Sequence, residues 1–381
     1  MKIATYNIQN LFHRSTELLK LEHGTKCEIW SEEFEKLFFK AKKTPDHLRR
    51  LRELADLLGF HDSRNGTQLS MSNMDGSLHA RSTIKVMETR ASYRTDWNGW
   101  TRLNSVPINK ESIINKAKVI LETDPDILLL QQVENRASLL QFHDHMFKDT
   151  PEPCYHEIIH LQGNGTLNLG MGLLLKKDYR LVNIKSYANE RDANGNLVFD
   201  TDFIKYKIKT PENRTLYLLN CQFSNEHRTD INLRKQAEFV AKIYEGLKAK
   251  GFNHIVIAGT FNAASYSKII SPIMDTEAMD IVKHGSFDVL PDSGSDSSYF
   301  RMGAYRMGVN IKQRDYLMAS PSLFGNINNC GMNRKALWPL KRPQWDTYDS
   351  MRNERDAASE HPLLWANFKP KTVQNLFKKS A

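Results

Sequence analysis

Cysteine is scarce in this sequence, and its spacing excludes several kinds of protein. The four cysteines, Cys27, Cys154, Cys221 and Cys330, are widely separated, and no CxxC pair occurs. A disulfide framework and a structural zinc site both require grouped cysteines, so the sequence predicts neither. We expect reduced, mostly buried thiols instead.

Long hydrophobic runs are also missing. No apolar stretch reaches the roughly 18 residues of a membrane-spanning helix, so the sequence predicts no transmembrane segment. The N-terminal residues 1–7 enter a strand pattern at once, which leaves no room for a signal peptide. We therefore expect a cytoplasmic protein.

What is present is the composition of a globular protein with a full core. Hydrophobic residues make up 40% of the 381 residues and charged residues 25%. A chain of this length can form one large domain or two ordinary ones. The net charge of +9 is compatible with a polyanionic partner such as nucleic acid.

Short strands dominate the predicted secondary structure. Strand patterns are found at residues 2–7, 126–134, 170–175, 203–208, 216–223, 255–258, 315–319 and 363–368. Helical stripes are found at about residues 45–58, 113–121, 137–147 and 232–248. Strands outnumber helices and often follow one another directly. This order favours a layered α/β structure with mixed sheets over a purely parallel sheet.

Polar side chains recur at the ends of these strands. The apolar run Ile127–Leu130 ends in Gln131, Gln132 and Glu134, at the position where α/β proteins usually place their chemistry. Alone, this pattern also fits a core strand that runs out into a solvated loop. The other strands repeat it, with Asn7, Asn220, Gln222, Thr260, Asn262, Asp315, Glu360 and His361. The repetition predicts that these side chains converge on one site.

The order of these motifs resembles the endonuclease/exonuclease/phosphatase superfamily, whose members include DNase I-like nucleases. The motifs are an early Asn, then L-Q-x-V-E-N, N-x-x, G-x-F-N, D-Y and S-x-H-P, and they span residues 1–12 and about 113–368. The resemblance implies a four-layer α/β/β/α sandwich of two mixed sheets. It also implies a divalent-metal-dependent phosphodiesterase site at one edge, to which Asn7, Asn220, Asn262, Asp315 and His361 contribute.

Three positions depart from the superfamily pattern. Gln132 replaces the metal-holding acid, Gln222 replaces a histidine that serves phosphate binding, and Thr260 replaces the aspartate that activates water. Magnesium prefers anionic oxygen ligands, and a threonine is no base near neutral pH. Glu134 is a candidate substitute ligand, because alternate residues of an extended strand point to the same side. Glu360 is expected to orient His361.

Three functions remain open. The first is a natural pseudoenzyme that binds a phosphate-containing ligand or nucleic acid. We favour a natural origin over deliberate inactivation, because three changes exceed what a designer needs. The second is an active phosphodiesterase or nuclease that uses Glu134, Glu360 and His361, with Mg²⁺ or Mn²⁺. The third is a protein-interaction module with a vestigial pocket.

Residues 13–107 lie outside the resemblance and are expected to be an insertion in a single domain of residues 1–381. Their basic residues are candidate phosphate or nucleic-acid contacts, or else a solvated helix face. These candidates are Arg49, Arg50, Arg52, Arg81 and Arg90, accompanied by Lys85 and Arg94. Trp97 and Trp100 either pack a loop or form a stacking platform. Residues 369–381 form a polar, basic tail.

Overall fold

We describe the protein from a computed structural model. The described residues are 1–15, 30, 33–34, 36–38, 40, 42–57, 69–75, 79–80, 88–89, 98–103, 105–147, 155–164, 169–223, 230–289, 313–338 and 345–369. The chain divides into two compact units, of which the first contains residues 1–9 and 109–381 and the second residues 10–108. The second unit covers nearly the same range as the expected insertion.

The first unit contains a seven-stranded mixed sheet. In spatial order its strands are β16 (Phe287–Val289), β18 (Ile327–Asn333), β19 (Leu363–Phe368), β1 (Lys2–Asn7), β8 (Ile127–Val133), β10 (Gly170–Leu175) and β9 (Glu157–Gln162). β1 pairs in parallel with β8 and antiparallel with β19. The N-terminal strand therefore occupies the middle of this sheet.

A second mixed sheet has six strands. Their order is β11 (Arg180–Ser186), β12 (Asp202–Lys209), β13 (Thr215–Gln222), β14 (Ile255–Thr260), β17 (Asp315–Ala319) and β15 (Met279–Asp280). Only β13 and β14 pair in parallel, and the 20-residue helix α5 (Asp230–Ala249) forms the crossover between them.

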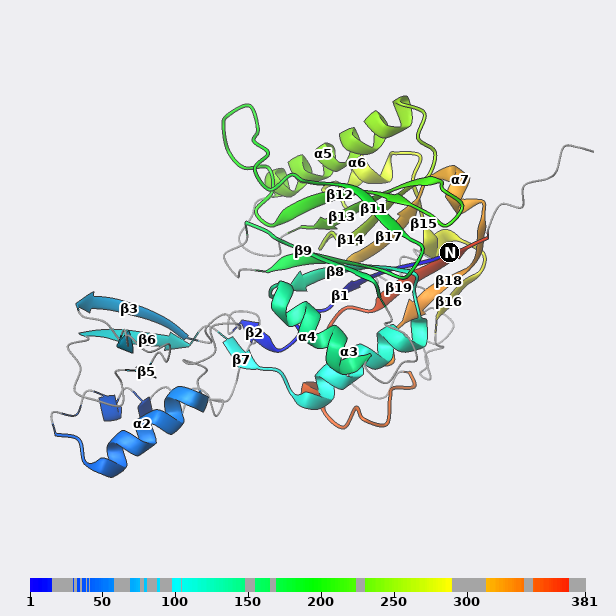
Figure 1. The fold of residues 1–381 in the computed structure, drawn as a ribbon. Helices are drawn as coiled ribbons and strands as arrows, with labels where there is room; N and C mark the ends of the chain where they lie inside the picture. The colour runs from blue at the N-terminus through cyan, green and yellow to red at the C-terminus, as the bar shows by residue number, and fades with distance from the viewer. Residues whose placement is uncertain are drawn as a thin grey trace, which may run out of the picture. The chain divides into compact units, whose positions relative to one another are not determined.

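The two sheets pack face to face and helices cover their outer sides (Figure 1). Apolar residues from both sheets, such as Ile3, Leu129, Tyr206 and Val256, form the core between them. A second apolar cluster joins the other face of the six-stranded sheet to α5. The remaining helices of this unit are α3 (Lys110–Thr123), α4 (Arg136–Met146), α6 (Ser271–Met274), α7 (Pro321–Phe324) and the 3₁₀ turns η2 (Ile281–Lys283) and η3 (Glu354–Asp356). The predicted α/β/β/α sandwich is confirmed.

The second unit is described by itself. Its helix α2 (Pro45–Leu57) matches the predicted helix and buries Leu51 and Leu54. Its strands form three two-stranded sheets, namely β2 (His13–Ser15) with β7 (Ser105–Pro107), β3 (Leu69–Asp75) with β6 (Asn98–Leu103), and β4 (His79–Ala80) with β5 (Glu88–Thr89).

Two general expectations are also tested by the structure. Cys221 and Cys330 are free and buried, as expected, and burial raises the pKa of both thiols. The other two cysteines lie outside the described residues. Among the described helices, none has the length and apolarity that a membrane crossing requires.

Candidate functional site

The candidate site lies where the inward-facing stripes of several strands turn from apolar to polar. In β1 the stripe runs Ile3, Thr5, Asn7, and in β8 it runs Ile127, Leu129, Gln131. The six-stranded sheet continues the pattern with Asn220 and Gln222 on β13, Thr260 on β14 and Asp315 on β17. All these polar side chains are buried. Buried polar groups need partners, so the strand ends are joined by hydrogen bonds across the two sheets.

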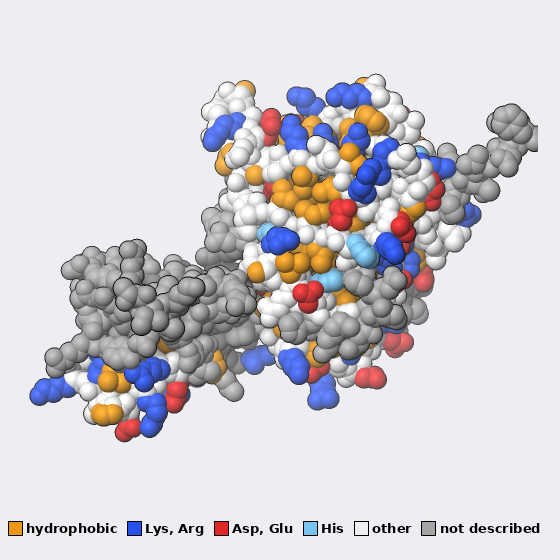
Figure 2. Space-filling model, viewed as in Figure 1, with side chains coloured by type: hydrophobic (Ala, Val, Ile, Leu, Met, Phe, Trp, Pro, Cys, Tyr) orange, Lys and Arg blue, Asp and Glu red, His pale blue; other side chains and the backbone are white. Residues whose placement is uncertain are grey.

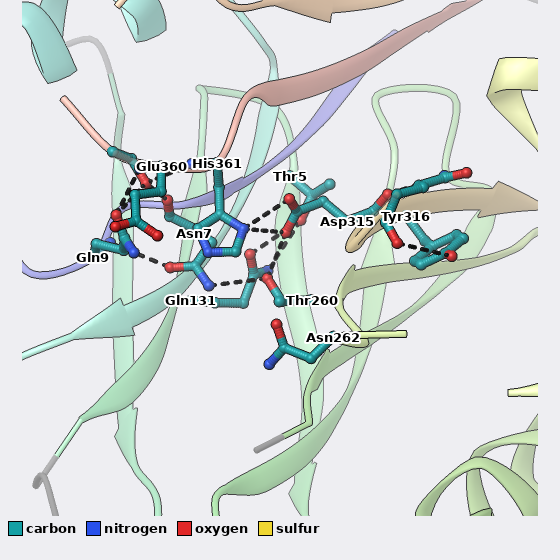
Figure 3. Close-up of polar contacts among 12 residues, drawn as sticks. Thr5, Asn7, Gln9, Gln131, Thr260, Asn262, Asp315, Tyr316, Glu360 and His361 are labelled. Carbon is teal, nitrogen blue, oxygen red and sulfur yellow. Dashed lines mark hydrogen bonds and ion pairs between the residues drawn. The ribbon is translucent and has the colours of Figure 1, made fainter. Parts of the chain in front are cut away.

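The best-defined interaction is the pair of Asp315 and His361. The Nδ1 atom of His361 lies 2.9 Å and 2.8 Å from the two carboxylate oxygens of Asp315 (Figure 3). His361 is 6% exposed and Asp315 is 4% exposed, so the pair is shielded from water. Because a carboxylate only accepts hydrogen bonds, Nδ1 carries the proton, and Nε2 is the ring nitrogen left for a ligand.

Thr260 connects this pair to the first sheet. Its hydroxyl Oγ1 donates to Asp315 Oδ1 at 2.6 Å and accepts from Asn7 Nδ2 at 3.0 Å. Asn7 Nδ2 also lies 3.4 Å from Gln222 Oε1. The single hydroxyl proton of Thr260 is therefore committed to Asp315. The expected convergence of these residues is observed, and none of the three neutral members can serve as a base.

A second chain of amides lies beside the first and was not singled out as part of the site. Gln131 Nε2 donates to Thr5 Oγ1 at 3.0 Å and to Asn220 Oδ1 at 2.7 Å. The sequence pattern identifies Gln131 only as a polar residue at the end of its strand. The signal that would have identified it is its position in the inward stripe of β8, two residues after Leu129.

Gln132 departs from regular strand geometry, which corrects one expectation. It has φ 58°, and the pairing of β8 with β10 shifts register there, between Leu130 and Val133. This irregularity is a β-bulge, so simple alternation does not apply. Strand alternation therefore does not place Glu134 on the same side as Gln132, and its role as a substitute ligand stays a prediction. Gln132 Oε1 is buried, and no described residue forms a hydrogen bond with it.

Glu360 does not orient His361, which is a second correction. Its side chain is exposed, and its backbone N–H donates to Gln9 Oε1 at 2.6 Å. The carboxylate partner of His361 is Asp315, which comes from a different sheet. Asn262, with φ 51°, donates from Nδ2 to the backbone carbonyl of Phe223 at 2.7 Å, so it fixes the strand end next to Gln222.

Helix α3 holds the segment that precedes His361. Ser112 Oγ donates to the carbonyl of Ala357 at 2.6 Å, and Asn115 Nδ2 donates to the carbonyl of Asp356 at 2.9 Å. The buried Lys116 ammonium donates to the next carbonyl, that of Ala358. Spacings of three and four residues put these donors on one helix face. Three successive carbonyls are thus anchored just before the site.

Of the three residues at the expected metal positions, two are neutral amides and only Glu134 carries a carboxylate. Mg²⁺ and Mn²⁺ favour carboxylate oxygens, whereas Asn7 and Gln132 offer neutral amides. Asp315 already accepts from His361 and Thr260. In the part of the chain that the structure describes, no three His, Cys, Asp or Glu side chains form a metal-binding group. The donor set suits hydrogen bonding rather than metal coordination.

The predicted basic contacts of the second unit are partly engaged by acids. Arg50 binds Glu33 through Nε and Nη2, both at 2.9 Å, and Arg49 lies 3.0 Å from Asp46. Arg52 belongs to the same helix. Lys85 and Arg94 lie outside the described residues, as do Arg81, Arg90 and Trp97, and the side chain of Trp100 is not described. These contacts stay predictions.

A cavity of about 540 Å³ lies away from this cluster, between the loop after β11 and the start of α5. Its lining includes Arg191, Asp192 and Lys235. Lys235 forms an ion pair with Asp192 at 2.9 Å, and Arg191 donates to the carbonyl of Gly195 at 2.6 Å. The hydrogen-bonded strand ends, and not this cavity, hold the predicted residues.

Comparison with known proteins gives similarity in structure but not in sequence. No protein-family model matches the chain, and no curated protein matches it. Similar solved structures include a mannosyl-6-phosphatase from Bacteroides thetaiotaomicron, which is 13% identical over 68% of this chain and 90% of that one, with a TM-score of 0.45. An endonuclease/exonuclease/phosphatase from Bacteroides vulgatus is 16% identical over 67% and 91% of the two chains, with a TM-score of 0.44.

The human Nocturnin catalytic domain with a bound sulfate anion is also similar. It is 15% identical over 68% of this chain and 87% of that one, with a TM-score of 0.42. Structures from the superfamily that the motifs resemble are therefore among those similar to this chain. At such identities the likeness concerns the fold.

Proposed function

We propose that this protein binds a phosphate-containing ligand at the Asp315–His361 pair without hydrolysing it through a metal. The observation that carries the proposal is the position of Thr260. Its hydroxyl bridges Asp315 and Asn7, where an attacking water would require a base. The pair itself is intact and buried, so His361 Nε2 is held in place to donate to a phosphate oxygen when the ring is protonated.

Gln132 supports a ligand that also carries a hydrogen-bond donor. Its buried Oε1 atom has no hydrogen-bond partner among the residues that the structure describes. Unpaired buried acceptors are costly, and a hydroxyl or amino group of the ligand would satisfy this one. Phosphate esters of sugars and nucleotides carry both groups. A nucleic acid is one such ligand, and a cytoplasmic location remains part of the proposal.

Binding and cleavage are measured on the same full-length protein. Calorimetric titration with a nucleoside monophosphate in EDTA should give saturable binding. His361→Ala should weaken it by roughly tenfold to a hundredfold, because a hydrogen bond between charged groups contributes about 1.5 to 3 kcal/mol. Lys110→Ala, an exposed change on α3, is the control and should bind as the original protein does.

The competing function is an active phosphodiesterase, which the intact Asp315–His361 pair favours. Bis(p-nitrophenyl) phosphate with Mg²⁺ or Mn²⁺ distinguishes the two. The proposal predicts no metal-dependent release of nitrophenol above background. Turnover that requires metal and disappears in Glu134→Ala would establish the enzyme instead.

A further inference from the structure

The outer face of β11 and β12 carries an unusual arrangement of positive charge. Register pairs three residues of each strand on this face, namely Arg180 with Lys209, Asn183 with Lys207, and Lys185 with Lys205. Five of these six side chains are cationic. Residues that face each other across a strand pair point to the same side of the sheet. The six positions therefore form one surface, which we call the β11–β12 face.

The opposite side of the same strands shows that this surface faces outward. Ile204, Tyr206 and Ile208 alternate with the lysines of β12 and pack in the core between the sheets. Leu181 and Ile184 of β11 pack against the same core. Strict alternation then directs the lysines to the other side. Lys and Arg side chains are visible where Figure 1 places β11, β12 and α5 (Figure 2).

Among the described residues, no carboxylate forms an ion pair with any of the five. Lys185 and Lys205 instead lie over the ring of Tyr187, at 4.7 Å and 5.8 Å from its centroid. Like charges directly opposite each other destabilise a strand pair by up to about 1 kcal/mol. An anionic partner would relieve the repulsion in the two such pairs on this face.

We infer that the β11–β12 face binds the sugar–phosphate backbone of a single-stranded nucleic acid. Alternate residues of a strand are about 6.6 Å apart, so β12 offers cations at a regular repeat. A nucleic-acid strand likewise carries one negative charge per nucleotide. None of the six positions carries a large apolar side chain, which an inserting membrane surface requires. This contact is separate from the phosphate site at His361 and does not depend on it.

The test is the salt dependence of binding of a fluorescein-labelled oligothymidylate to the full-length protein, followed by anisotropy. Each phosphate contact with a single strand contributes about 0.7 to the slope of log K against log salt concentration. The face variant combines Lys205→Gln, Lys207→Gln and Lys209→Gln. Its slope should be smaller by about 2, because three phosphate contacts are lost.

The matched control changes the net charge equally at three exposed lysines outside this face. It combines Lys110→Gln, Lys250→Gln and Lys283→Gln, and its slope should stay close to that of the original protein. Equal losses of slope in both triple variants would overturn the inference, since only overall charge would matter. An unchanged oligonucleotide slope with lost binding to phosphatidylserine vesicles would overturn it in favour of a membrane surface. Nucleoside monophosphate affinity, which depends on His361, reports separately on the proposed function.

Discussion

Thr260 and Asp315 show how one side chain sets the chemistry of a buried site. The threonine hydroxyl donates to the aspartate, and together they leave one negative charge at this point. An acid at position 260 would place two carboxylates side by side in a region where Thr260 is fully buried. Two such groups cannot both ionise without a cation between them. The neutral residue therefore stabilises the site in the absence of metal.

The first prediction compares Thr260→Asp with Thr260→Asn, which has similar size but no charge. At neutral pH the aspartate variant should be less stable than the asparagine variant by about 3 kcal/mol, because the new carboxyl group must either take up a proton or bury a second charge next to Asp315. Urea unfolding measures the difference. Adding Gln132→Glu should make the aspartate variant respond to Mg²⁺ with a higher melting temperature. Equal stability of the two single variants would contradict this account.

Asp280 is a buried carboxyl group outside the site, and it makes stability depend on pH. It is 1% exposed and accepts from Gln313 Nε2 at 2.8 Å. Burial raises its pKa to about 6. The folded state then holds the proton more tightly than the unfolded state, whose carboxyl has a pKa of about 3.9. This contribution favours folding in acid and is lost as the pH rises from about 4 to about 6.

The second prediction follows from this sign. Titration of Asp280 lowers the free energy of unfolding of the original protein between pH 5 and pH 8. In Asp280→Asn this decrease should be smaller by on the order of 1 to 2 kcal/mol. Burial also raises the pKa of Asp202 to about 6, but Asp202 is present in both proteins and its effect cancels. Urea unfolding at pH 5 and at pH 8 measures the free energy of unfolding, and the change between the two pH values is compared for the two proteins. Identical changes would show that Asp280 does not titrate in this range.

At the scale of elements, α3 acts as a support for the site although it contributes no residue to it. Its side chains fix the carbonyls of residues 356–358, and His361 follows three residues later. Ser359 continues the support, because its Oγ donates to the carbonyl of Asn7 at 2.7 Å. The position of His361 thus depends on contacts between α3 and the loop of residues 356–359, which are far apart in the sequence.

The third prediction concerns Asn115→Leu, which keeps the size of the side chain but removes its donor. Unfolding free energy should fall by about 1 to 3 kcal/mol, because the carbonyl of Asp356 loses its buried partner. Affinity for a nucleoside monophosphate should fall as well, since His361 is less well positioned. Thr123→Val, which removes a hydroxyl bonded within the same helix, is the control. It should lower stability alone, and an equal loss of affinity would refute the positioning role.

Much of this fold was predictable because its strands have simple patterns. β1, β10, β17 and β19 lie where alternation or apolar runs placed them. The sequence does not predict the edge strands β9 and β11, since polar residues interrupt their apolar pattern. The short strands β15 and β16 are defined by their neighbours rather than by their own sequence.

The site was predictable in membership but not in pairing. The strand-end motifs named Asn7, Thr260, Asp315 and His361, and the structure brings them together. Which carboxylate faces His361 depends on how two sheets pack, and local sequence suggested the adjacent Glu360 instead. The positive φ of Gln132 was equally hidden, because glutamine carries no preference for that conformation.

At the scale of the whole molecule, the net charge of +9 is distributed unevenly. The β11–β12 face gathers five cations that form no ion pair with any described carboxylate, whereas Arg49 and Arg50 of the second unit lie next to acids. Exposed ion pairs contribute little, so the second unit can still contact a polyanion weakly. The molecule therefore combines a buried, hydrogen-bonded cluster of side chains with a separate cationic surface.

The most direct test is the dissociation constant of a nucleoside monophosphate, measured by calorimetry with EDTA and again with Mg²⁺, while phosphate release is followed in the same samples. The account predicts similar constants under both conditions and no release of phosphate. Binding that requires Mg²⁺, accompanied by phosphate release, would contradict it.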